Sequence, residues 1–485
     1  MGTISSALSL ITSALDADQS ALGIVANNVA NANTTGYTRE VPNWQENPPV
    51  VINGVSTGSG VTETGATSIR DNVLDQRLAQ QQQLASASGA RLTALNTLQA
   101  LFTPDSGTST ATAGDIGSDI TSFFDSFSSL ANSGTPTDNA LRQQVISTAS
   151  TLAGDVSNAA ASINSQRSAL DQEAAGVTSQ VNALTTAIAQ LNQQIQTTSP
   201  NTDAGTLEDQ RQQDISQLSQ LVGINQITSN DNGLAITTTS GQLLVSDSSS
   251  FQLTTGMSGG VTHFFLGTTD ITSSLQTGGG ELGGYLTARD QDLPDTLTAL
   301  DQLAYSVSTE VNAANNSGTN LSGVEGTGTN SSGVTGTGTT PLYIFSQPTQ
   351  VAGSAAAMSV ITSDPGQIAA AGFGDGTGDN SNATAMANIG NQATVAGQTP
   401  SDFYSQFVSD LGSTVSEVQT ENTAQSASVT QLQTQQSSLS SVNLNDEAAS
   451  MQQFERAYQA ASEVFTILNT VMAAALNLGV QTAVS

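Results

Sequence analysis

The sequence predicts a mainly α-helical protein with a β-rich part, an elongated α+β chain built from several nested domains. Apolar side chains at both ends recur at alternating steps of three and four, the spacing of a coiled coil. The helical period also returns through much of the middle. Two other segments, 41–70 and 224–284, carry short apolar runs separated by turn residues, as antiparallel strands do. The length of 485 residues exceeds what one hydrophobic core usually serves.

The first helix is predicted over residues 3–31. Its apolar row consists of Ile4, Leu8, Ile11, Leu15, Leu22, Val25 and Val29. The segment from Asn33 to Tyr37 should end the helix, because turn formers follow one another there and Gly36 adopts a positive φ at little cost. Prolines exclude a helix from 41 to 70, and Asn53-Gly54 between apolar runs predicts a hairpin turn.

Helical spacing resumes at residue 71. The predicted helices of the middle of the chain are 71–102, 115–131, 139–195, 207–223 and 282–312. Between them, residues 224–284 change to the strand period and predict a small antiparallel β domain.

The segment 317–340 consists almost entirely of Gly, Thr, Ser and Asn, and a seven-residue motif beginning at Gly323 recurs ten positions later. Such a composition buries too little apolar surface to offset the entropy of ordering, so it predicts a flexible loop. The run from Gly374 to Asp379 resembles a calcium-binding Gly/Asp repeat, but it occurs once, which favours a plain loop. Helices should return from residue 400 to residue 442.

The last helix carries the second long apolar row: Met451, Phe454, Tyr458, Ala461, Phe465, Leu468, Met472 and Ala475. We therefore expect four parts. They are a terminal coiled-coil assembly domain (1–40 plus 441–485), a mainly helical middle domain with short β hairpins (41–223 plus 285–316 and 400–440), a β-rich outer domain (224–284), and a Gly/Thr-rich loop with a small irregular segment (317–399).

The paired ends have two interpretations. Amphipathic helices usually cover the core of their own chain. Two long helices packed only on each other, however, bury little surface for the backbone entropy that they lose. We therefore expect both ends to be mobile in the free monomer and helical in an assembly, which favours an assembly subunit over an enzyme.

Composition excludes several classes of function. Acidic residues outnumber basic ones by 40 to 9, and every basic residue is an arginine, so a nucleic-acid or anionic-membrane partner is disfavoured. No run of 18 apolar residues predicts a membrane span. The chain has no cysteine, and its single histidine, His263, lies in an alternating strand. Ser-His-Asp and Cys-His catalysis and zinc sites are thereby excluded, and we expect no enzyme activity, cofactor or metal.

The run from Asn27 to Arg39, NNVANANTTGYTR, closely resembles the signature of bacterial flagellar axial proteins of the rod and hook group, which flagellin lacks. Further blocks narrow the resemblance to the hook-associated protein 1 family, which forms the first hook–filament junction. They are Gly58–Val61, Ile69–Gln76, Leu207–Gly223, Gly280–Gly284 with Arg289-Asp290, and Ser441–Glu447 followed by Phe454, Tyr458 and Ala460. These blocks span nearly the whole chain.

The resemblance implies a secreted structural subunit of the extracellular flagellum, exported unfolded by a type III apparatus without a cleaved signal peptide. Its partners would be about ten further copies in a ring of about eleven, the hook protein and the second junction protein. An export chaperone would hold the last helix beforehand. Some family members carry a further outer β domain before a block that matches Asp364–Ala369 here; residues 316–364 are short and Gly/Thr-rich, so we expect no such domain.

The candidate site residues follow from the two rows and the turn between them. The assembly interface is predicted to comprise Ile4, Leu8, Ile11, Leu15, Leu22, Val25, Asn28, Asn31, Asn33, Gly36, Tyr37, Met451, Phe454, Tyr458, Phe465, Leu468 and Met472. Polar residues of the turn would bond neighbouring subunits. The chaperone contact is predicted at Met451, Phe454, Tyr458, Phe465 and Leu468, because this row is otherwise exposed.

Two alternatives remain open. A hook or distal rod protein would share the signature, but its middle would be mostly β, whereas residues 139–222 are strongly helical here. A secreted adhesin or effector with a coiled-coil stalk would also show paired terminal rows. Localisation at hook–filament junctions separates these classes.

Overall fold

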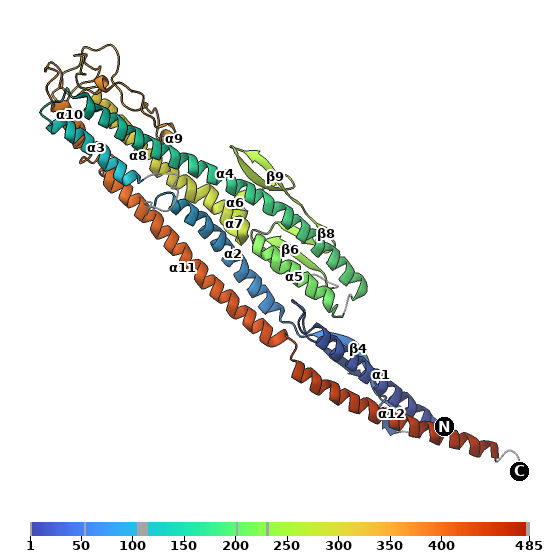
Figure 1. Cartoon of the computed structure of the whole chain (residues 1–485). Helices are drawn as coiled ribbons and strands as arrows, with labels where there is room; N and C mark the ends of the chain where they lie inside the picture. Colours follow the sequence, from blue (N-terminus) through green and yellow to red (C-terminus); the bar gives the residue numbers. More distant parts are fainter. Residues whose placement is uncertain (1, 53–54, 104–114, 200–201, 229–231, 482–485) are drawn as a thin grey trace.

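The computed structural model describes all residues except 1, 53–54, 104–114, 200–201, 229–231 and 482–485. The molecule is elongated, and the two ends of the chain lie together at one extremity (Figure 1). The loops of 317–399 lie at the opposite extremity. The chain therefore runs outward from its N-terminus and returns, which confirms the predicted elongated, mainly helical α+β fold.

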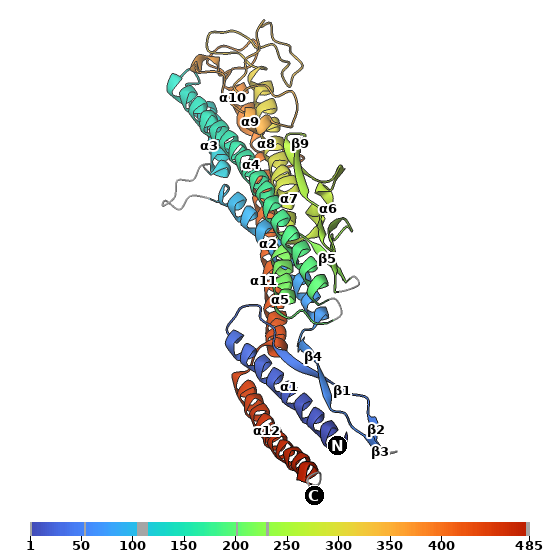
Figure 2. The same cartoon turned by 90° about the vertical axis from the view of Figure 1, so that its right-hand side faces the viewer.

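We call the end that carries both termini the terminal unit. It consists of α1 (Gly2–Asn31), α12 (Leu444–Gln481) and an antiparallel ribbon formed by β1 (Glu40–Glu46), β2 (Val50–Ile52), β3 (Val55–Thr57) and β4 (Val61–Ser68). The helices α1 and α12 pack side by side, and β1 and β4 pair beside α1 (Figure 2). The predicted turn at Asn53-Gly54 lies outside the described residues, although β2 and β3 pair on either side of it.

The remainder, which we call the body, is built on long helices. They are α2 (Asn72–Ala100), α3 (Ile116–Asn132), α4 (Asn139–Thr198), α5 (Thr206–Leu221), α8 (Leu293–Asn315) and α11 (Pro400–Ser440). Their boundaries confirm the predicted helices, because the chain places a capping side chain before most of them. Asp71, Asp115, Asp138 and Thr399 each accept a hydrogen bond from a backbone N–H of the first turn.

The main core lies between α2, α3, α4, α8 and α11. Phe123 and Phe127 of α3 are fully buried there, and Phe123 contacts the rings of Phe124, Phe127 and Phe345. A second core joins the lower half of α4 to α5 and the outer strands. Since α4 contributes to both cores, one 60-residue helix connects them.

The outer β part differs from the prediction at its end. Four strands form one sheet: β5 (Ile224–Thr228), β6 (Leu234–Thr238), β7 (Leu243–Ser246) and β8 (Ser249–Ser250). Three form a second: β9 (Leu253–Ser258), β10 (Val261–Leu266) and β11 (Thr269–Asp270). Residues 272–284 were expected in this β part but are helical, in α6 (Thr272–Gly278) and α7 (Gly280–Thr287). The glycines of this stretch have low helix propensity, so the sequence did not predict these helices. The same glycines allow close packing, because a Cβ on Gly284 would lie 2.3 Å from the carbonyl oxygen of Ala87.

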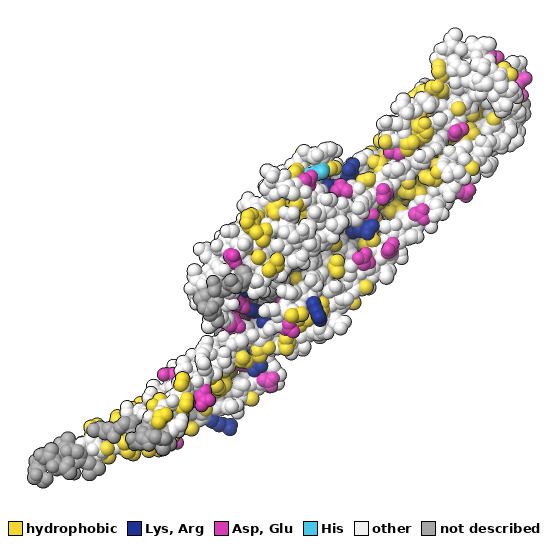
Figure 3. Space-filling view, turned by 180° about the vertical axis from the view of Figure 1, so that it is seen from behind, with side chains coloured by type: hydrophobic (Ala, Val, Ile, Leu, Met, Phe, Trp, Pro, Cys, Tyr) yellow, Lys and Arg dark blue, Asp and Glu magenta, His cyan; other side chains and the backbone are white. Residues whose placement is uncertain are grey.

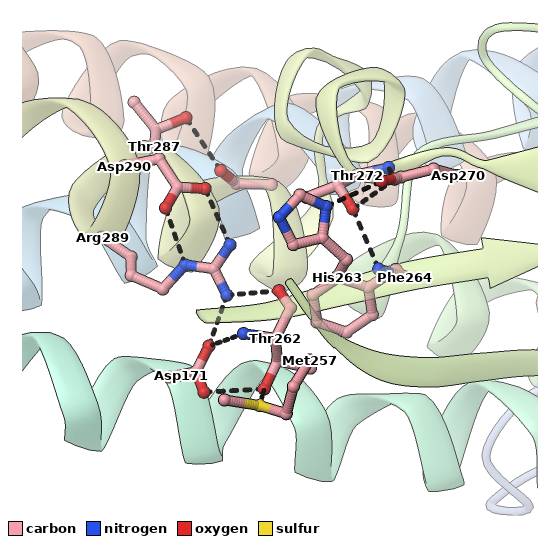
Figure 4. A network of polar contacts seen from close by, with 11 residues as sticks. Asp171, Met257, Thr262, His263, Phe264, Asp270, Thr272, Thr287, Arg289 and Asp290 are labelled. Carbon is pink, nitrogen blue, oxygen red and sulfur yellow. Dashed lines mark hydrogen bonds and ion pairs between the residues drawn. The ribbon is translucent and has the colours of Figure 1, made fainter. Parts of the chain in front are cut away.

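A buried arginine holds the second sheet on α4 (Figure 4). Arg289 lies in a π-helical turn, η1 (Ala288–Asp292), between α7 and α8. Its Nη1 donates to Asp171 Oδ1 of α4 at 2.5 Å and to the carbonyl oxygen of Thr262 in β10 at 2.8 Å. Asp171 also accepts from the backbone and hydroxyl of Thr262. His263, the only histidine, bonds Asp270 at the edge of this sheet, as expected for a structural residue.

The predicted flexible loop at 317–340 has a repeated hydrogen-bonded form instead. Asn320 Oδ1 accepts from the backbone N–H groups of residues 322 and 324, and Asn330 Oδ1 does the same for residues 332 and 334. The two turns stack, since Gly326 donates to the carbonyl of Gly318 and Gly336 to that of Gly328. A Cβ on Gly326 would lie 2.1 Å from a backbone oxygen. The two turns can therefore stack only because glycine has no side chain at this position. Three short helical turns, α9 (Ser354–Ala357), η2 (Pro365–Gln367) and α10 (Ser381–Ile389), complete this end.

Candidate functional site: the joint between the terminal unit and the body

Two segments of backbone connect the terminal unit to the body. They are residues 68–72 between β4 and α2 and residues 440–444 between α11 and α12, and residues 37–40, which join α1 to β1, lie against both. The backbone links them to one another, because Arg39 N donates to the carbonyl of Ser440 at 2.9 Å and Ile69 N to that of Arg39 at 2.8 Å. The signature segment from Asn27 to Arg39 lies at this joint.

Glu447 holds the centre of the joint. Its residue is 1% exposed, at the first turn of α12. One carboxylate oxygen accepts from Arg39 Nε at 2.6 Å, and the other accepts from Asn28 Nδ2 at 3.0 Å. These partners lie more than 400 positions away in the sequence, so a buried carboxylate of the C-terminal helix is satisfied entirely by the N-terminal segment.

Asn28 forms the central hydrogen bonds of the N-terminal segment at this joint. It is 1% exposed, and its Oδ1 accepts from Tyr37 Oη at 2.8 Å and from Glu40 N at 3.0 Å. Its Nδ2 also donates to the carbonyl of Glu40 at 2.8 Å. The amide of asparagine suits this position because it donates two hydrogen bonds and accepts two at the same time. Burial, and then the carboxylates of Glu40, Asp209 and Glu447, raise the pKa of Tyr37, so its hydroxyl stays a donor.

Carboxylates of α5 attach the body to the same turn. Asp209 accepts from the backbone N–H of Thr38 at 2.9 Å and from Arg70 Nη2 at 2.6 Å, while Glu208 pairs with the other end of the Arg70 guanidinium. Asp203 accepts from the backbone and hydroxyl of Ser68. Burial by itself would lower the pKa of Arg70, but these carboxylates raise it, so the arginine remains charged. The joint is therefore held by charge-assisted hydrogen bonds rather than by an apolar core.

A cavity of about 320 Å³ lies beside the joint, between α2, α5 and α11. Thr35, Gly36 and Thr38 of the signature segment line it together with Asp75. Asp75 is 4% exposed and accepts from Gln436 Nε2 at 2.6 Å, and burial raises the pKa of its carboxyl.

The two apolar rows meet as predicted between α1 and α12. The rows lie half-buried at Ile4, Leu8, Ile11, Leu15 and Leu22 on α1 and at Met451, Phe454, Phe465, Leu468 and Met472 on α12, and Val25 is buried. The apolar side chains packed most deeply along α1 are Ala21 and Val25, at 0% and 3% exposure, followed by Ala17 at 5%. Trp44 of β1 contacts the ring of Phe454 edge-on at 5.7 Å, so the ribbon also covers α12.

Tyr458 departs from the predicted row. Its side chain is 38% exposed, and Ala457 takes the step toward α1 instead. After Phe454, a step of three leads to Ala457 and a step of four leads to Tyr458, so the pattern allowed either residue in the row. The larger side chain, Tyr458, lies at the edge of the contact. Tyr458 therefore stays accessible when α12 is packed on α1.

The turn residues divide into two groups. The polar atoms of Asn28 and Tyr37 bond within the chain. Asn31 Nδ2 likewise bonds the backbone of Asn27 one turn earlier. That polar residues of the turn bond neighbouring subunits stays a prediction. Asn33 and Gly36 are exposed, and Gly36 has a φ of 81°, as its place in the turn requires.

Helix α12 has a second apolar face, which the sequence pattern did not distinguish from the predicted apolar row. Val464, Ile467, Val471 and Leu476 are between 41% and 59% exposed and lie away from α1. Valine and isoleucine three and four positions apart on one helix face are the signal that marks it. The pair α1–α12 thus buries one apolar face and presents another.

The chain is similar to proteins of the bacterial flagellum. Residues 105–330 match the family described as flagellar hook-associated protein FlgK helical domain, and residues 11–38 match flagella basal body rod protein. Flagellar hook-associated protein 1 of Escherichia coli K12 is 26% identical over 98% of this chain and 100% of its own length. The Bacillus subtilis 168 protein of that name is 28% identical over 96% of both chains. Over nearly its whole length, this chain is similar to flagellar hook-associated protein 1.

A solved structure agrees with the fold of this chain. The hook junction protein FlgK from Burkholderia pseudomallei superimposes with a TM-score of 0.62 at 20% identity, over 75% of this chain and 100% of that one. Among the described residues, no three acidic, histidine or cysteine side chains are grouped so that they could hold a metal ion. Within that same part of the chain, every helix is too short or too polar to cross a membrane.

Proposed function

We propose that this chain is a structural subunit of the extracellular flagellum that joins hook to filament as a ring of about eleven copies. The carrying observation is the exposed apolar face of α12 beside a completed α1–α12 pair. A secreted subunit that kept this face in water would be prone to aggregate, whereas a neighbouring helix pair would cover it. The names of its relatives, which refer to the hook, support the same location.

The partners follow from the layout. Lateral neighbours are further copies, the axial neighbours are the hook protein and the second junction protein, and the terminal unit is the contact region. Residues Met451, Phe454, Phe465 and Leu468 are half-buried against α1. An export chaperone would therefore bind them before α12 packs on α1, while Tyr458 remains available in both states.

The joint contributes the orientation of the terminal unit. In this proposal the bonds of Asn28 and Arg39 to Glu447 set the angle at which α1 and α12 leave the body. The catalytic alternative has no support, since the carboxylates of the joint are engaged by arginine, amide and backbone donors. No observation favours a hook protein or an adhesin over the junction subunit.

The test is to replace Ile467, which is 59% exposed, by aspartate. A charge on this face should prevent incorporation at the hook–filament junction, measured by immunogold labelling and by filament number in cells that lack the native gene. The matched control is Val324→Asp at the far end, where valine is 49% exposed. Normal labelling of the Ile467→Asp protein would contradict the proposal, provided that its urea unfolding midpoint is unchanged.

A further inference from the structure

A concave site lies on the flank of the body formed by α2, α8 and α11. Its volume is about 330 Å³. Leu95 of α2 and the rings of Phe403 and Phe407 of α11 supply apolar walls, and Phe407 is fixed edge-on against Phe102 at 5.0 Å. We call this site the flank pocket.

Three carboxylates surround these apolar walls. Asp292 forms two hydrogen bonds of 2.8 Å with the guanidinium of Arg91. Asp295 and Asp410 are both exposed, and neither forms an ion pair with any residue that the structure describes. Asp410 accepts only an amide hydrogen bond, from Gln406 Nε2 at 2.6 Å. Aromatic faces beside uncompensated carboxylates suit a guanidinium, which both stacks and donates in a fork.

The chain itself has few cations that could fill this pocket in a second copy. It contains nine arginines and no lysine. Four of the arginines form ion pairs, Arg142 and Arg211 are held by carbonyl and amide oxygens inside the fold, and the remainder are Arg77, Arg167 and Arg456. Among these, Arg167 has a buried Nε without a hydrogen-bond partner in the isolated chain.

Arg167 lies at the level of the flank pocket along the molecule. The neighbouring Gln166 donates from Nε2 to the carbonyl of Ala94 at 2.7 Å, and the next residue, Leu95, lines the pocket. Arg77 lies 18 residues earlier on α2, about 27 Å away at 1.5 Å per residue. Arg456 belongs to the terminal unit, beyond the joint.

Arg167 and the flank pocket also face in different directions. Arg167 is on α4 and the pocket is on α11, and these helices run along opposite edges of the body (Figure 1). Acidic side chains are spread along the body while basic ones are few (Figure 3), and α11 has no basic residue at all. Two different edges that complement each other allow a head-to-tail contact between copies, and such contacts close into a ring when the rotation between copies permits it.

We propose that Arg167 of one copy inserts into the flank pocket of the adjacent copy, between Asp295 and Asp410 and against Phe403 and Phe407. This contact lies in the body, separate from the terminal helices. It also lowers the repulsion between copies that each carry a net charge of −31. The inference rests on the proposed ring, since it supplies a lateral contact for that assembly.

The test is a charge swap in the full-length protein. Arg167→Glu and Asp295→Arg should each reduce the amount of protein in purified hook–filament junctions at least about tenfold, because like charges then meet across the interface. The double variant should restore most of it. The matched control is Arg77→Glu, which should incorporate normally. Circular dichroism and the urea midpoint of each monomer establish that folding is unchanged.

A second measurement uses the absence of cysteine from the chain. Cysteines introduced at 167 and 295 should be joined by a short bis-maleimide into a ladder of multimers in assembled flagella, whereas cysteines at 77 and 295 should not. If the unaltered protein labels the junction but Arg167→Glu also assembles fully, or the 77–295 pair gives the ladder, the Arg167 contact is wrong. If the unaltered protein is absent from the junction, the proposed function itself fails.

Discussion

The body and the terminal unit bury their apolar residues to very different extents. In the body, whole helix faces reach zero exposure, as at Phe123, Phe127 and Leu130 of α3. In the terminal unit the buried apolar side chains are few, Ala17, Ala21 and Val25, and most of the large apolar ones stay half-exposed. The difference shows that the body holds its own shape. The terminal unit depends on a polar joint within the chain and leaves apolar surface for other molecules.

The largest expected effect is a break in the body core. Phe123→Ala should lower the free energy of unfolding by about 3–5 kcal/mol, because it removes a fully buried ring that contacts three others. Urea denaturation followed by circular dichroism measures this. The matched change in the terminal unit, Ile467→Ala, should shift it by less than about 0.5 kcal/mol. Equal effects would remove the distinction between the two regions.

Glu447→Gln tests whether the joint alone orders the terminal unit. The amide cannot accept from both Arg39 and Asn28, so a buried donor is left unpaired at a cost of about 1–3 kcal/mol. Amide hydrogen exchange in α1 and α12 should accelerate at least about fivefold, while exchange in α3 and α4 stays constant. Glu455→Gln, exposed on α12, is the control. Faster exchange throughout the body would show that the two regions unfold together.

Asp119 gives the body a pH dependence that one substitution can test. Burial, and then the hydrogen bond and charge of Asp155, raise the pKa of Asp119 from 3.8 to about 7. A carboxyl that binds its proton more tightly in the folded chain destabilises the fold when ionised, so stability should fall as pH rises from about 4 to 7. Asp119→Asn should flatten this slope in urea titrations, and the exposed Asp125→Asn should not. An unchanged slope in Asp119→Asn would contradict the assignment.

The local sequence pattern was sufficient to predict most of the helices and strands. The row from Val145 to Ile195 repeats the helical period without interruption, and the structure has one helix there, α4. The predictions for the glycine-rich stretches were wrong in two ways. Residues 280–284 form a helix because glycine lets α7 approach α2, and residues 317–340 stack in regular turns because glycine lets one backbone pass over another. In both places the packing of distant segments decides the structure, which single-sequence propensity does not contain.

The joint was the least predictable part. The signature after Asn27 marked the right segment, but nothing local indicates that Glu447 and Asp209 would be its partners. A backbone-to-carboxylate hydrogen bond between residues 171 positions apart and an ion pair between residues 408 positions apart leave no period in the sequence. The exposed face at Val464 and Ile467 was visible as apolar residues, and only the position of α1 separated it from the packed row.

The two covalent connections at the joint have a mechanical consequence. A torque applied to the terminal unit reaches the body through two covalent segments in parallel, residues 68–72 and 440–444, which the bonds of Arg39 tie together. From there α4 extends about 90 Å as a continuous rod through both cores. The load is therefore carried along the helix axes and shared between the connecting segments of the chain. Rotation at one end is transmitted to the far end without first unfolding either core.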